Sequence, residues 1–382
     1  MGEPSVYQKR DSFAAFRLRS SADGVMERIR GARDRVAQAP LSERDKGVVL
    51  QACEELLGPA EGGGASRFTL QPYVVDEISR LEDAELPRYL LYRFRYEMFP
   101  QRHALDEFPP CLQIEPTSVC NYRCVFCYQT DRELTDRRNG HMGVMPLDLF
   151  TRLIDQAQGR CEAVTLASRG EPLLCPDIEA MLAYCAGKFL ALKLNTNASR
   201  LTDTHCHAIL RAGVNTVVFS ADAAAEPAYS RFRVGGSLER VRAGIARFHE
   251  IRASHYPRSR TITRVSGVQV PETPAIDEME AFWGGLVDQV AFVKYNPWEN
   301  TYERPVNGLT APCSDLWRRM FVWWDGTCNP CDVDYRSTLA VGNAREQPLS
   351  VLWCSAPYQA LRERHLGRQR SRCAPCNRCT VV

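Results

Sequence analysis

The sequence predicts an α/β fold in which a parallel sheet curls into a partial or complete barrel. From residue 111 onward, short apolar runs alternate with amphipathic segments that are long enough to form crossover helices. Six such β/α units in succession favour a parallel sheet, because parallel neighbours are joined by crossover connections. Polar residues directly follow four of the apolar runs. We expect a ligand there, since such folds bind ligands at the carboxyl ends of their strands.

The expected strands are short apolar runs bounded by polar or glycine-containing segments. They cover residues 111–115, 163–167, 190–194, 216–219, 261–268 and 290–295. The segments between them carry apolar residues at helical spacing. These expected helices cover residues 146–158, 176–187, 202–212, 238–254 and 275–287. Strands and helices therefore alternate regularly over about half of the chain.

Three domains are expected: a helical extension over residues 1–108, the barrel over 109–302 and a cysteine-bearing module over 303–382. The extension has apolar residues at helical spacing in four places and one glycine-rich break. The helical stretches lie near residues 25–29, 48–57, 75–81 and 86–98, and the break covers 58–64. Because no catalytic constellation occurs there, we expect the extension to be a capping or docking element.

The composition is that of an ordinary globular protein, with 45% hydrophobic and 25% charged residues. Lysine and arginine number 48 against 46 acidic residues, so the net charge of +2 offers no field to attract nucleic acid or anionic lipid. The chain opens with Met1-Gly2-Glu3-Pro4 and lacks an apolar run of about 18 residues. We therefore expect a cytoplasmic protein with no nucleic-acid partner and no membrane partner.

The unusual feature of the composition is its 16 cysteines. Thiols stay reduced in the cytoplasm, so an excess of cysteine indicates metal binding or catalytic sulfur rather than disulfides. Cys120, Cys124 and Cys127 lie within eight residues, immediately after the first expected strand. A loop of this length can wrap three thiolates around one [4Fe–4S] cubane and leave its fourth iron open. Zinc is the competing metal, but a structural zinc site needs a fourth ligand, for which His141 is a weak candidate.

These cysteines form a C-x3-C-x2-C motif with an aromatic residue, Phe126, before the last cysteine. In this motif the sequence resembles the radical SAM enzymes. The resemblance implies a partial (β/α)6 barrel and an open iron that binds the amino and carboxylate groups of S-adenosylmethionine. One electron, supplied by a flavodoxin or ferredoxin, then yields methionine and a 5′-deoxyadenosyl radical, which removes a hydrogen atom from the substrate.

The resemblance extends to the ends of the following strands, where Ser168-Arg169-Gly170-Glu171-Pro172 stands in place of the family's GGE-type turn. Arg169 departs from that pattern, because it replaces the first glycine. Arg233 resembles the arginine that pairs with the methionine carboxylate, a task suited to a planar fork of donors. The cofactor-binding residues that the resemblance implies are Phe126, Gly170, Glu171, Asn195, Asn197, Ser220, Asp222 and Arg233.

Each of these polar residues also has a purely structural interpretation. Asn195 or Asn197 could shape a turn, and Asp222 could cap the next helix. Arg233 could be solvated. The functional interpretation is favoured because all four follow the cysteine motif at the appropriate strand ends.

The last 70 residues carry a second group of cysteines. Cys313, Gly326 and Cys331, followed by a C-x2-C-x2-C tail, resemble the SPASM and twitch extensions of radical SAM enzymes, in which a β-hairpin and a following helix carry auxiliary clusters. The tail is too short for two clusters, so we expect a twitch-like module with one [4Fe–4S] cluster on Cys313, Cys331, Cys373 and Cys376. Cys328 and Cys379 are competing ligands, and a zinc ribbon is the alternative. The other seven cysteines are expected to be mainly core residues.

The resemblance implies hydrogen abstraction from a small molecule, either a carbohydrate or an aminocyclitol, as in twitch-containing aminoglycoside dehydrogenases. Dehydrogenation follows if the auxiliary cluster accepts an electron, and epimerisation follows if a thiol returns a hydrogen atom. Modification of a ribosomally made peptide is the second enzymatic hypothesis, and a non-catalytic metal scaffold is a third. Nothing ranks Cys175, Lys294 or His141, all near expected strand ends, as base or hydrogen donor.

Overall fold

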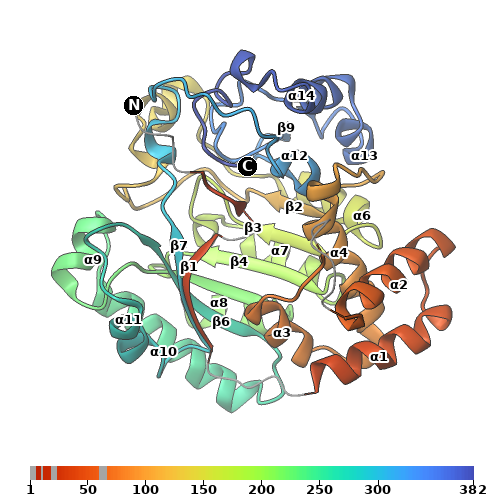
Figure 1. Ribbon diagram of the computed structural model, residues 1–382. Coiled ribbons are helices and arrows are strands. Elements are labelled where there is room, and N and C mark those ends of the chain that lie inside the picture. The colour runs from red at the N-terminus through yellow and green to blue at the C-terminus, as the bar shows by residue number, and fades with distance from the viewer. Residues whose placement is uncertain (1–5, 10–11, 19–23, 60–66) are drawn as a thin grey trace.

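The computed structural model describes residues 6–9, 12–18, 24–59 and 67–382 and contains the predicted open barrel (Figure 1). Six parallel strands are neighbours in chain order, and each pairs in register with the next. They are β2 (Cys111–Ile114), β3 (Ala163–Leu166), β4 (Ala191–Thr196), β5 (Thr216–Ser220), β6 (Ile262–Gln269) and β7 (Gln289–Lys294). The strands curl without closing, because β2 and β7 do not pair with each other. The predicted partial (β/α)6 barrel is therefore confirmed.

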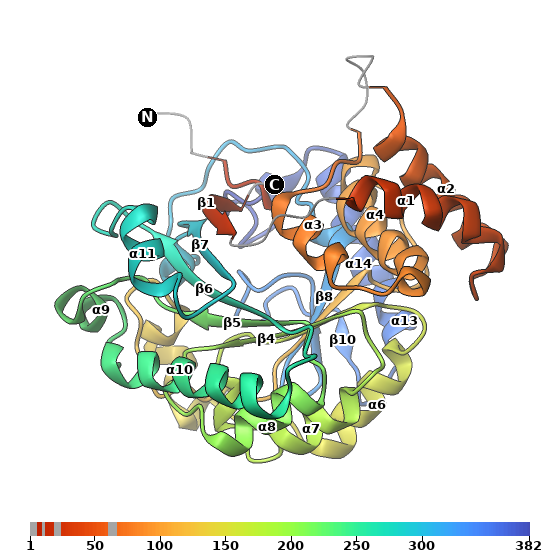
Figure 2. The same cartoon turned by 90° about the horizontal axis from the view of Figure 1, so that it is seen from below.

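Helices cover the outer face of these strands, as Figure 2 shows most clearly. Their apolar residues pack with those of the sheet in one large core. They are α6 (Leu147–Ala157), α7 (Ile178–Cys185), α8 (Asp203–Arg211), α10 (Leu238–His255) and α11 (Ile276–Trp283). Two short helices were not expected, α5 (Arg132–Thr135) and α9 (Glu226–Phe232). Each is too short to produce a clear helical repeat in the sequence.

Strand β4 shows how the sheet separates its two faces. Leu192 and Leu194 are buried in the core beneath the helices, whereas Lys193 and Asn195 line the interior of the barrel. Successive side chains of a strand point to opposite faces, so this alternation makes the barrel interior polar. The interior therefore has the character of a binding site rather than of a packed core.

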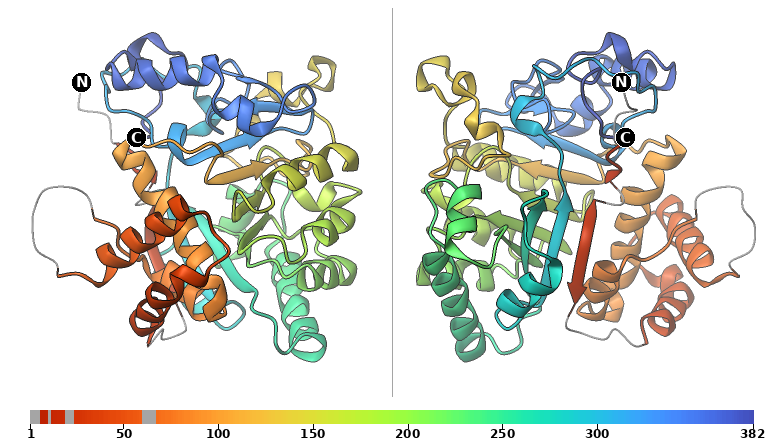
Figure 3. Two further views of the ribbon diagram at one scale, coloured as in Figure 1. Left: turned by 90° about the vertical axis from the view of Figure 1, so that its right-hand side faces the viewer. Right: turned by 60° about the vertical axis from the view of Figure 1, so that its left-hand side comes forward.

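The N-terminal extension contains the expected helices and one strand that the sequence analysis missed (Figure 3). Its helices are α1 (Val25–Arg35), α2 (Glu43–Leu57), α3 (Pro72–Ser79) and α4 (Leu86–Arg102). Strand β1 (Phe13–Leu18) pairs antiparallel with β7 and extends the sheet at that edge. The expectation that the extension is purely helical is therefore wrong for this segment. Strand β1 pairs with β7, which is distant in the sequence. Most of the expected break at 58–64 lies outside the described residues.

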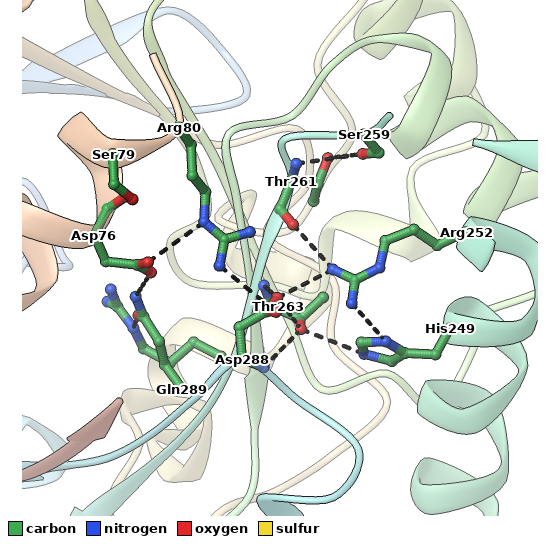
Figure 4. Close-up of polar contacts among 11 residues, drawn as sticks. Asp76, Ser79, Arg80, His249, Arg252, Ser259, Thr261, Thr263, Asp288 and Gln289 are labelled. Atoms are coloured by element: carbon green, nitrogen blue, oxygen red, sulfur yellow. Dashed lines mark hydrogen bonds and ion pairs between the residues drawn. The ribbon is translucent and has the colours of Figure 1, made fainter. Parts of the chain in front are cut away.

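A polar network fixes the extension to the amino ends of β6 and β7 (Figure 4). Gln289 donates to the buried carboxylate of Asp76 in α3 at 2.6 Å. Asp288 lies 3.6 Å from Arg80, which directly follows α3, and accepts from Arg252 of α10 at 3.0 Å. These contacts lie at the opposite end of the strands from the cysteine loop, so they attach the extension without occupying the expected site.

The C-terminal module continues the same sheet at its other edge. Strand β8 (Arg319–Val322) pairs parallel to β2, and it forms an antiparallel hairpin with β9 (Thr327–Asn329), which pairs with the short β10 (Gly342–Asn343). Helices α12 (Asp315–Arg318), α13 (Leu349–Trp353) and α14 (Ala356–Leu366) flank this hairpin. The predicted hairpin with following helices is confirmed. None of the helices that the structure describes combines the length and apolar character needed to cross a bilayer.

Arg169 connects the barrel to the C-terminal module. Its guanidinium donates to both carboxylate oxygens of Glu115, at 2.8 and 2.7 Å, and to the carbonyl of Tyr335 at 3.0 Å. The same group lies 4.5 Å from the centre of the Trp323 ring. The side chains of Arg169 and Glu115 are only 4% and 0% exposed, so each charge depends on the other for stabilisation.

Replacing Arg169 by methionine should leave the Glu115 carboxylate buried without its cation. Loss of one partner from a buried pair destabilises by about 3–5 kcal/mol, so we expect a clear fall in the melting temperature (Tm). Arg138→Met is the control, because Arg138 belongs to an exposed ion pair with Asp136 and its loss should leave Tm unchanged. Equal Tm values for the two variants would contradict the role given to Arg169.

Candidate active site

The three clustered cysteines lie in the loop between β2 and the 3₁₀ helix η4 (Tyr128–Thr130). Backbone hydrogen bonds hold this loop against the segment before α10, from Arg123 N to Val234 O at 2.9 Å and from Val125 N to Phe232 O at 3.1 Å. The thiols of Cys120, Cys124 and Cys127 lie close enough for their charges to interact, and all three line the barrel cavity. The sequence prediction that they form one group is therefore consistent with the structure.

Burial changes the chemistry of these thiols. It raises the pKa of Cys120 to about 12 and also raises the pKa values of Cys124 and Cys127. Thiolates are the metal-binding form, so the bare site holds protons that a cationic iron–sulfur group would displace. Three thiols, one short of a closed tetrahedral set, suit a cluster that keeps one position free for another ligand.

The turn that contains Gly170 packs directly against the cysteine loop. A Cβ atom at Gly170 would lie 2.2 Å from Thr117 O and 2.6 Å from Val119 O. The neighbouring Glu171 N donates to Val119 O at 2.9 Å. Only glycine permits this approach, which explains why position 170 of the turn is a glycine.

Glu171 is buried at the base of this turn and is held by three donors. Its Oε1 accepts from Thr196 Oγ1 at 2.6 Å and from Leu173 N at 3.1 Å, and its Oε2 accepts from Asn197 N at 2.6 Å. Burial raises the pKa of Glu171, and these hydrogen bonds oppose that shift. Thr196 is among the polar residues that follow the third expected strand, but its role as a donor to Glu171 was not predicted from the sequence.

Asn195 and Asn197 differ in their surroundings. Asn195 Oδ1 is buried and has no hydrogen-bond partner in the described part of the chain, and Asn195 lines the cavity. Asn197 instead donates to Asn121 Oδ1 at 3.1 Å and accepts from Ser199 Oγ at 2.6 Å, which ties the end of β4 to the cysteine loop. An unpartnered buried oxygen is costly in the absence of a ligand, so Asn195 is the stronger candidate for cofactor contact.

Arg233 lies beside the cysteine loop and is oriented by Asp222. Its Nε donates to Asp222 Oδ2, its Nη1 lies 3.5 Å from Cys124 Sγ, and its guanidinium carbon lies 5.2 Å from the Phe126 ring centre. Arg233, Phe126 and Ser220 line the cavity, whereas Asp222 is fully buried outside it and also accepts from Val268 N. Asp222 therefore positions Arg233 and is not itself available to a ligand in this arrangement.

One cavity of about 450 Å³ brings these residues together. It extends from the cysteine loop into the barrel interior and reaches α4 of the N-terminal extension. Its size lies within the range of small-molecule sites, roughly 300–1,000 Å³. Cys175, Lys294 and His141 do not line it, and Cys175 is buried in the core instead.

The C-terminal cysteines form a second group around Cys376. Cys313, Cys373 and Cys379 lie close enough to Cys376 for a thiolate at any of them to raise its pKa, and Cys376 and Cys313 lie as close to Cys331. Cys328 is buried in the β8–β9 hairpin, where its thiol contacts Gly326 O, and it has no such interaction with another cysteine. The structure therefore separates Cys328 from this group and keeps Cys379 as a competitor for a fourth ligand position.

The described residues contain no group of three or more histidine, cysteine, aspartate or glutamate side chains arranged to hold one metal ion. Ligands of a single zinc ion lie about 2.0–2.3 Å from it and so close to one another. The cysteines that hold a cubane lie farther apart, so this absence among the described residues says nothing about an iron–sulfur cluster.

Two family models match the chain in the order that the fold suggests. Residues 114–263 match the radical SAM superfamily, and residues 313–380 match an iron–sulfur cluster-binding domain of the SPASM type. The chain therefore contains a radical SAM domain followed by a SPASM-type domain. These two domains imply S-adenosylmethionine, a [4Fe–4S] cluster and auxiliary iron–sulfur as cofactors.

Curated relatives share limited identity with the chain. The tungsten-containing aldehyde ferredoxin oxidoreductase cofactor-modifying protein of Pyrococcus furiosus is 24% identical over 304 residues, which cover 65% of this chain and 81% of that protein. The AdoMet-dependent heme synthase of Methanosarcina barkeri is 29% identical over 143 residues, which cover 37% of this chain and 40% of that protein. The relatives therefore differ widely in substrate.

Two solved structures were compared with the chain. SuiB of Streptococcus suis, bound to its precursor peptide SuiA, is 18% identical with a TM-score of 0.52, covering 84% of this chain and 78% of its own. BtrN in complex with AdoMet and 2-DOIA is 16% identical with a TM-score of 0.49, covering 73% of this chain and 95% of its own. At such identities the likeness to SuiB supports the fold alone.

Replacing Gly170 by alanine should separate the Gly170 turn from the cysteine loop, because the new methyl group would overlap Thr117 O. We expect S-adenosylmethionine binding to weaken by at least ~10-fold in anaerobic equilibrium dialysis. Gly47→Ala is the matched control, since a Cβ at Gly47 in helix α2 meets no atom within 4 Å. That control should bind normally, and normal binding by Gly170→Ala would contradict the role of the turn.

Proposed function

We propose that this radical SAM enzyme abstracts a hydrogen atom from a carbohydrate-like small molecule, such as a sugar or an aminocyclitol, to dehydrogenate or epimerise it. The observation that carries the proposal is the single cavity that is lined by the three clustered cysteines, by the polar strand ends and by the extension. Its size suits a small molecule beside the cofactor. A flavodoxin or ferredoxin is the proposed electron donor.

In this proposal Cys120, Cys124 and Cys127 hold the cluster that binds S-adenosylmethionine. When bound, the cluster supplies the electron that cleaves S-adenosylmethionine and so generates the hydrogen-abstracting radical. Glu171 and the backbone at Gly170 hold the amino group of the cofactor. Asn195 Oδ1, which has no partner in the described part of the chain, would accept from it, and the guanidinium of Arg233 would pair with its carboxylate.

Phe126, Asn197, Ser220 and Asp222 have different parts in the same site. Phe126 and Ser220 line the cavity beside the cofactor, whereas Asn197 and Asp222 position the cysteine loop and Arg233 through the hydrogen bonds described above. In this proposal some residues contact the cofactor, and their neighbours hold the contacting groups in fixed orientations.

The auxiliary cluster decides between the two outcomes. We assign it to Cys313, Cys331, Cys373 and Cys376, which lie near one another with Cys379 nearby. After the 5′-deoxyadenosyl radical has removed a hydrogen atom from the carbinol carbon, an auxiliary cluster held there would accept one electron while a base takes the hydroxyl proton, and the carbinol would become a ketone. A thiol that returns a hydrogen atom to the opposite face would instead give the epimer.

Modification of a ribosomally made peptide is the second candidate. It is supported by the likeness in fold to SuiB, whose structure was solved with its precursor peptide SuiA. The two candidates predict different substrates in one assay. Anaerobic protein with dithionite, S-adenosylmethionine and either a sugar panel or peptides should release 5′-deoxyadenosine faster only with the correct class.

The reaction outcome can be obtained from the same assay in deuterated water. A mass loss of two hydrogens in the product indicates dehydrogenation, and a deuterium on carbon indicates epimerisation. Failure of the protein to release any 5′-deoxyadenosine under these conditions would overturn the proposed function.

Replacing Cys124 by alanine should abolish release of 5′-deoxyadenosine, because two thiols cannot hold the cluster in place. Iron-dependent absorbance from the auxiliary site should remain, at about half of the original value. Cys206→Ala is the control, since Cys206 is buried in helix α8 away from the cavity. Retained cleavage by Cys124→Ala would contradict the assignment of the first site.

Replacing Cys331 by alanine should remove about four irons per chain while leaving cleavage of S-adenosylmethionine measurable. Iron and zinc contents by mass spectrometry test this, with the exposed Cys354→Ala as the control. Unchanged iron with loss of zinc would instead identify the C-terminal group as a zinc site.

A further inference from the structure

The end of the cavity opposite the cysteine loop is lined by an excess of cations. Lys193 of β4, Arg264 of β6, Arg319 of β8, Arg318 of α12 and Arg93 of α4 all line it. Two carboxylates, those of Glu77 and Glu97, line the same end. Five cations against two anions leave a surplus of three positive charges. The whole chain has a net charge of only +2, so this concentration is local.

Lys193 has no carboxylate within ion-pairing distance among the described residues. It faces the barrel interior near Arg264 and Arg319, whose charges disfavour a third cation, whereas the carboxylate of Glu77, beyond ion-pairing distance, favours it. Burial is the larger cause, and together these effects lower the pKa of Lys193 to about 8. An interior ammonium group without a counter-ion costs stability, so its presence calls for a ligand.

Arg264 is only 4% exposed and is also incompletely satisfied. Its Nε donates to Gln289 Oε1 at 2.7 Å, but its Nη2 is buried without a hydrogen-bond partner in the described part of the chain. Phe13 of β1 lies over the guanidinium, 5.2 Å from ring centre to carbon, and shields it from solvent. Arg264 therefore presents free donors to the cavity in a surrounding of low polarity, where an anion would bind strongly.

The other charged groups at this end have nearby partners, although the Nε atoms of Arg93 and Arg319 lack a hydrogen bond in the described part of the chain. Arg318 Nε donates to Tyr96 O at 3.1 Å. Arg93 is paired with Glu97, and Glu77 accepts from the hydroxyl of Tyr89. Arg319 donates to Gln113 Oε1 at 3.1 Å, and its Nε lies 4.0 Å from Asp315, a carboxylate that is also 3.3 Å from Lys9. Lys193 and Arg264 thus remain as the cations with the least compensation.

The strand register gives the position of these cations relative to the cofactor residues. Lys193 precedes Asn195 by two residues on β4, and Arg264 precedes Ser266, the partner of Ser220, by two residues on β6. Two residues of a strand span about 7 Å. The cations therefore lie one side-chain layer below the residues proposed to contact S-adenosylmethionine, at a distance that a sugar-sized molecule can span.

We propose that Lys193 and Arg264, with Arg319, bind a carboxylate or phosphate group of the substrate and so hold its opposite end toward the cofactor. The inference rests on the proposed function for the identity of this cavity as the substrate site. Within the carbohydrate class it favours sugar acids and sugar phosphates. It disfavours an aminocyclitol, because an ammonium group would be repelled by the same cations.

Binding of simple anions tests the inference without any turnover. Inorganic phosphate and acetate are titrated into anaerobic, cluster-reconstituted protein by calorimetry, as probes for the phosphate and carboxylate cases. We expect one of them to bind once per chain, and the tighter probe identifies the group. Lys193→Met and Arg264→Gln should each weaken this binding at least ~10-fold, a loss of about 1.4 kcal/mol. Arg240→Met, which removes an exposed cation of α10, should leave it unchanged.

Lys193→Arg is the control for a folding defect, because it keeps the positive charge and should retain anion binding within a few-fold. Absence of saturable binding by both anions, or equal binding by wild type and Lys193→Met, would overturn the inference. Tighter binding of glucosamine than of glucuronate or glucose 6-phosphate would overturn it as well. Anion binding by a protein that releases no 5′-deoxyadenosine would refute the proposed function and leave the anion site standing.

Thermal unfolding gives an independent measurement. If the Lys193 ammonium is free of a counter-ion, Lys193→Met should raise Tm by about 2–4 °C at pH 7. The penalty is fully present below the folded pKa of about 8, and it disappears as pH rises toward the ordinary value of 10.5, so the difference should shrink over that range. A lower Tm for Lys193→Met at pH 7 would show that the ammonium already has a stabilising partner and would contradict the inference.

Discussion

The close contact between the Gly170 turn and the cysteine loop is the constraint on which the rest of the site depends. A Cβ atom at Gly170 would overlap the backbone of that loop, so the two segments can meet only because the side chain is absent. The contact places Glu171 where Thr196 and Asn197 can hold its carboxylate. Three strand ends are thereby fixed to one another, and the thiols, the carboxylate and the free amide oxygen of Asn195 face one cavity.

The sequence predicted the parallel core well because its signals are local. Alternating apolar runs and helical segments specify β2 to β7 and the helices between them to within a few residues. Strand β1 was missed because its pairing with β7 joins residues nearly 280 positions apart, and no local pattern encodes that partner. The parallel pairing of β8 with β2 is non-local in the same way, so the sequence could suggest a hairpin but not its attachment to the barrel.

In the candidate site too, the sequence predicted which residues to consider but not how they are arranged. The motif indicated which residues to consider, and the structure distinguishes groups that face the cavity, such as Asn195 and Arg233, from supporting groups such as Asp222 and Asn197. Arg169 seemed a departure from a glycine-rich turn, yet it forms the buried link from Glu115 to the C-terminal module. Which partner a side chain meets depends on tertiary contacts, so these roles could not be predicted from spacing.

The N-terminal extension lines the end of the cavity that lies opposite the cysteine loop. Asp76 of α3 accepts from Gln289, which in turn accepts from Arg264, so the extension sets the orientation of that guanidinium. Phe13 of β1 covers the same group, and α4 supplies Arg93 and Glu97 to the lining. An element attached at the amino ends of the strands therefore shapes the part of the cavity farthest from the cysteine loop. The two ends of the cavity are thus built by different segments of the chain.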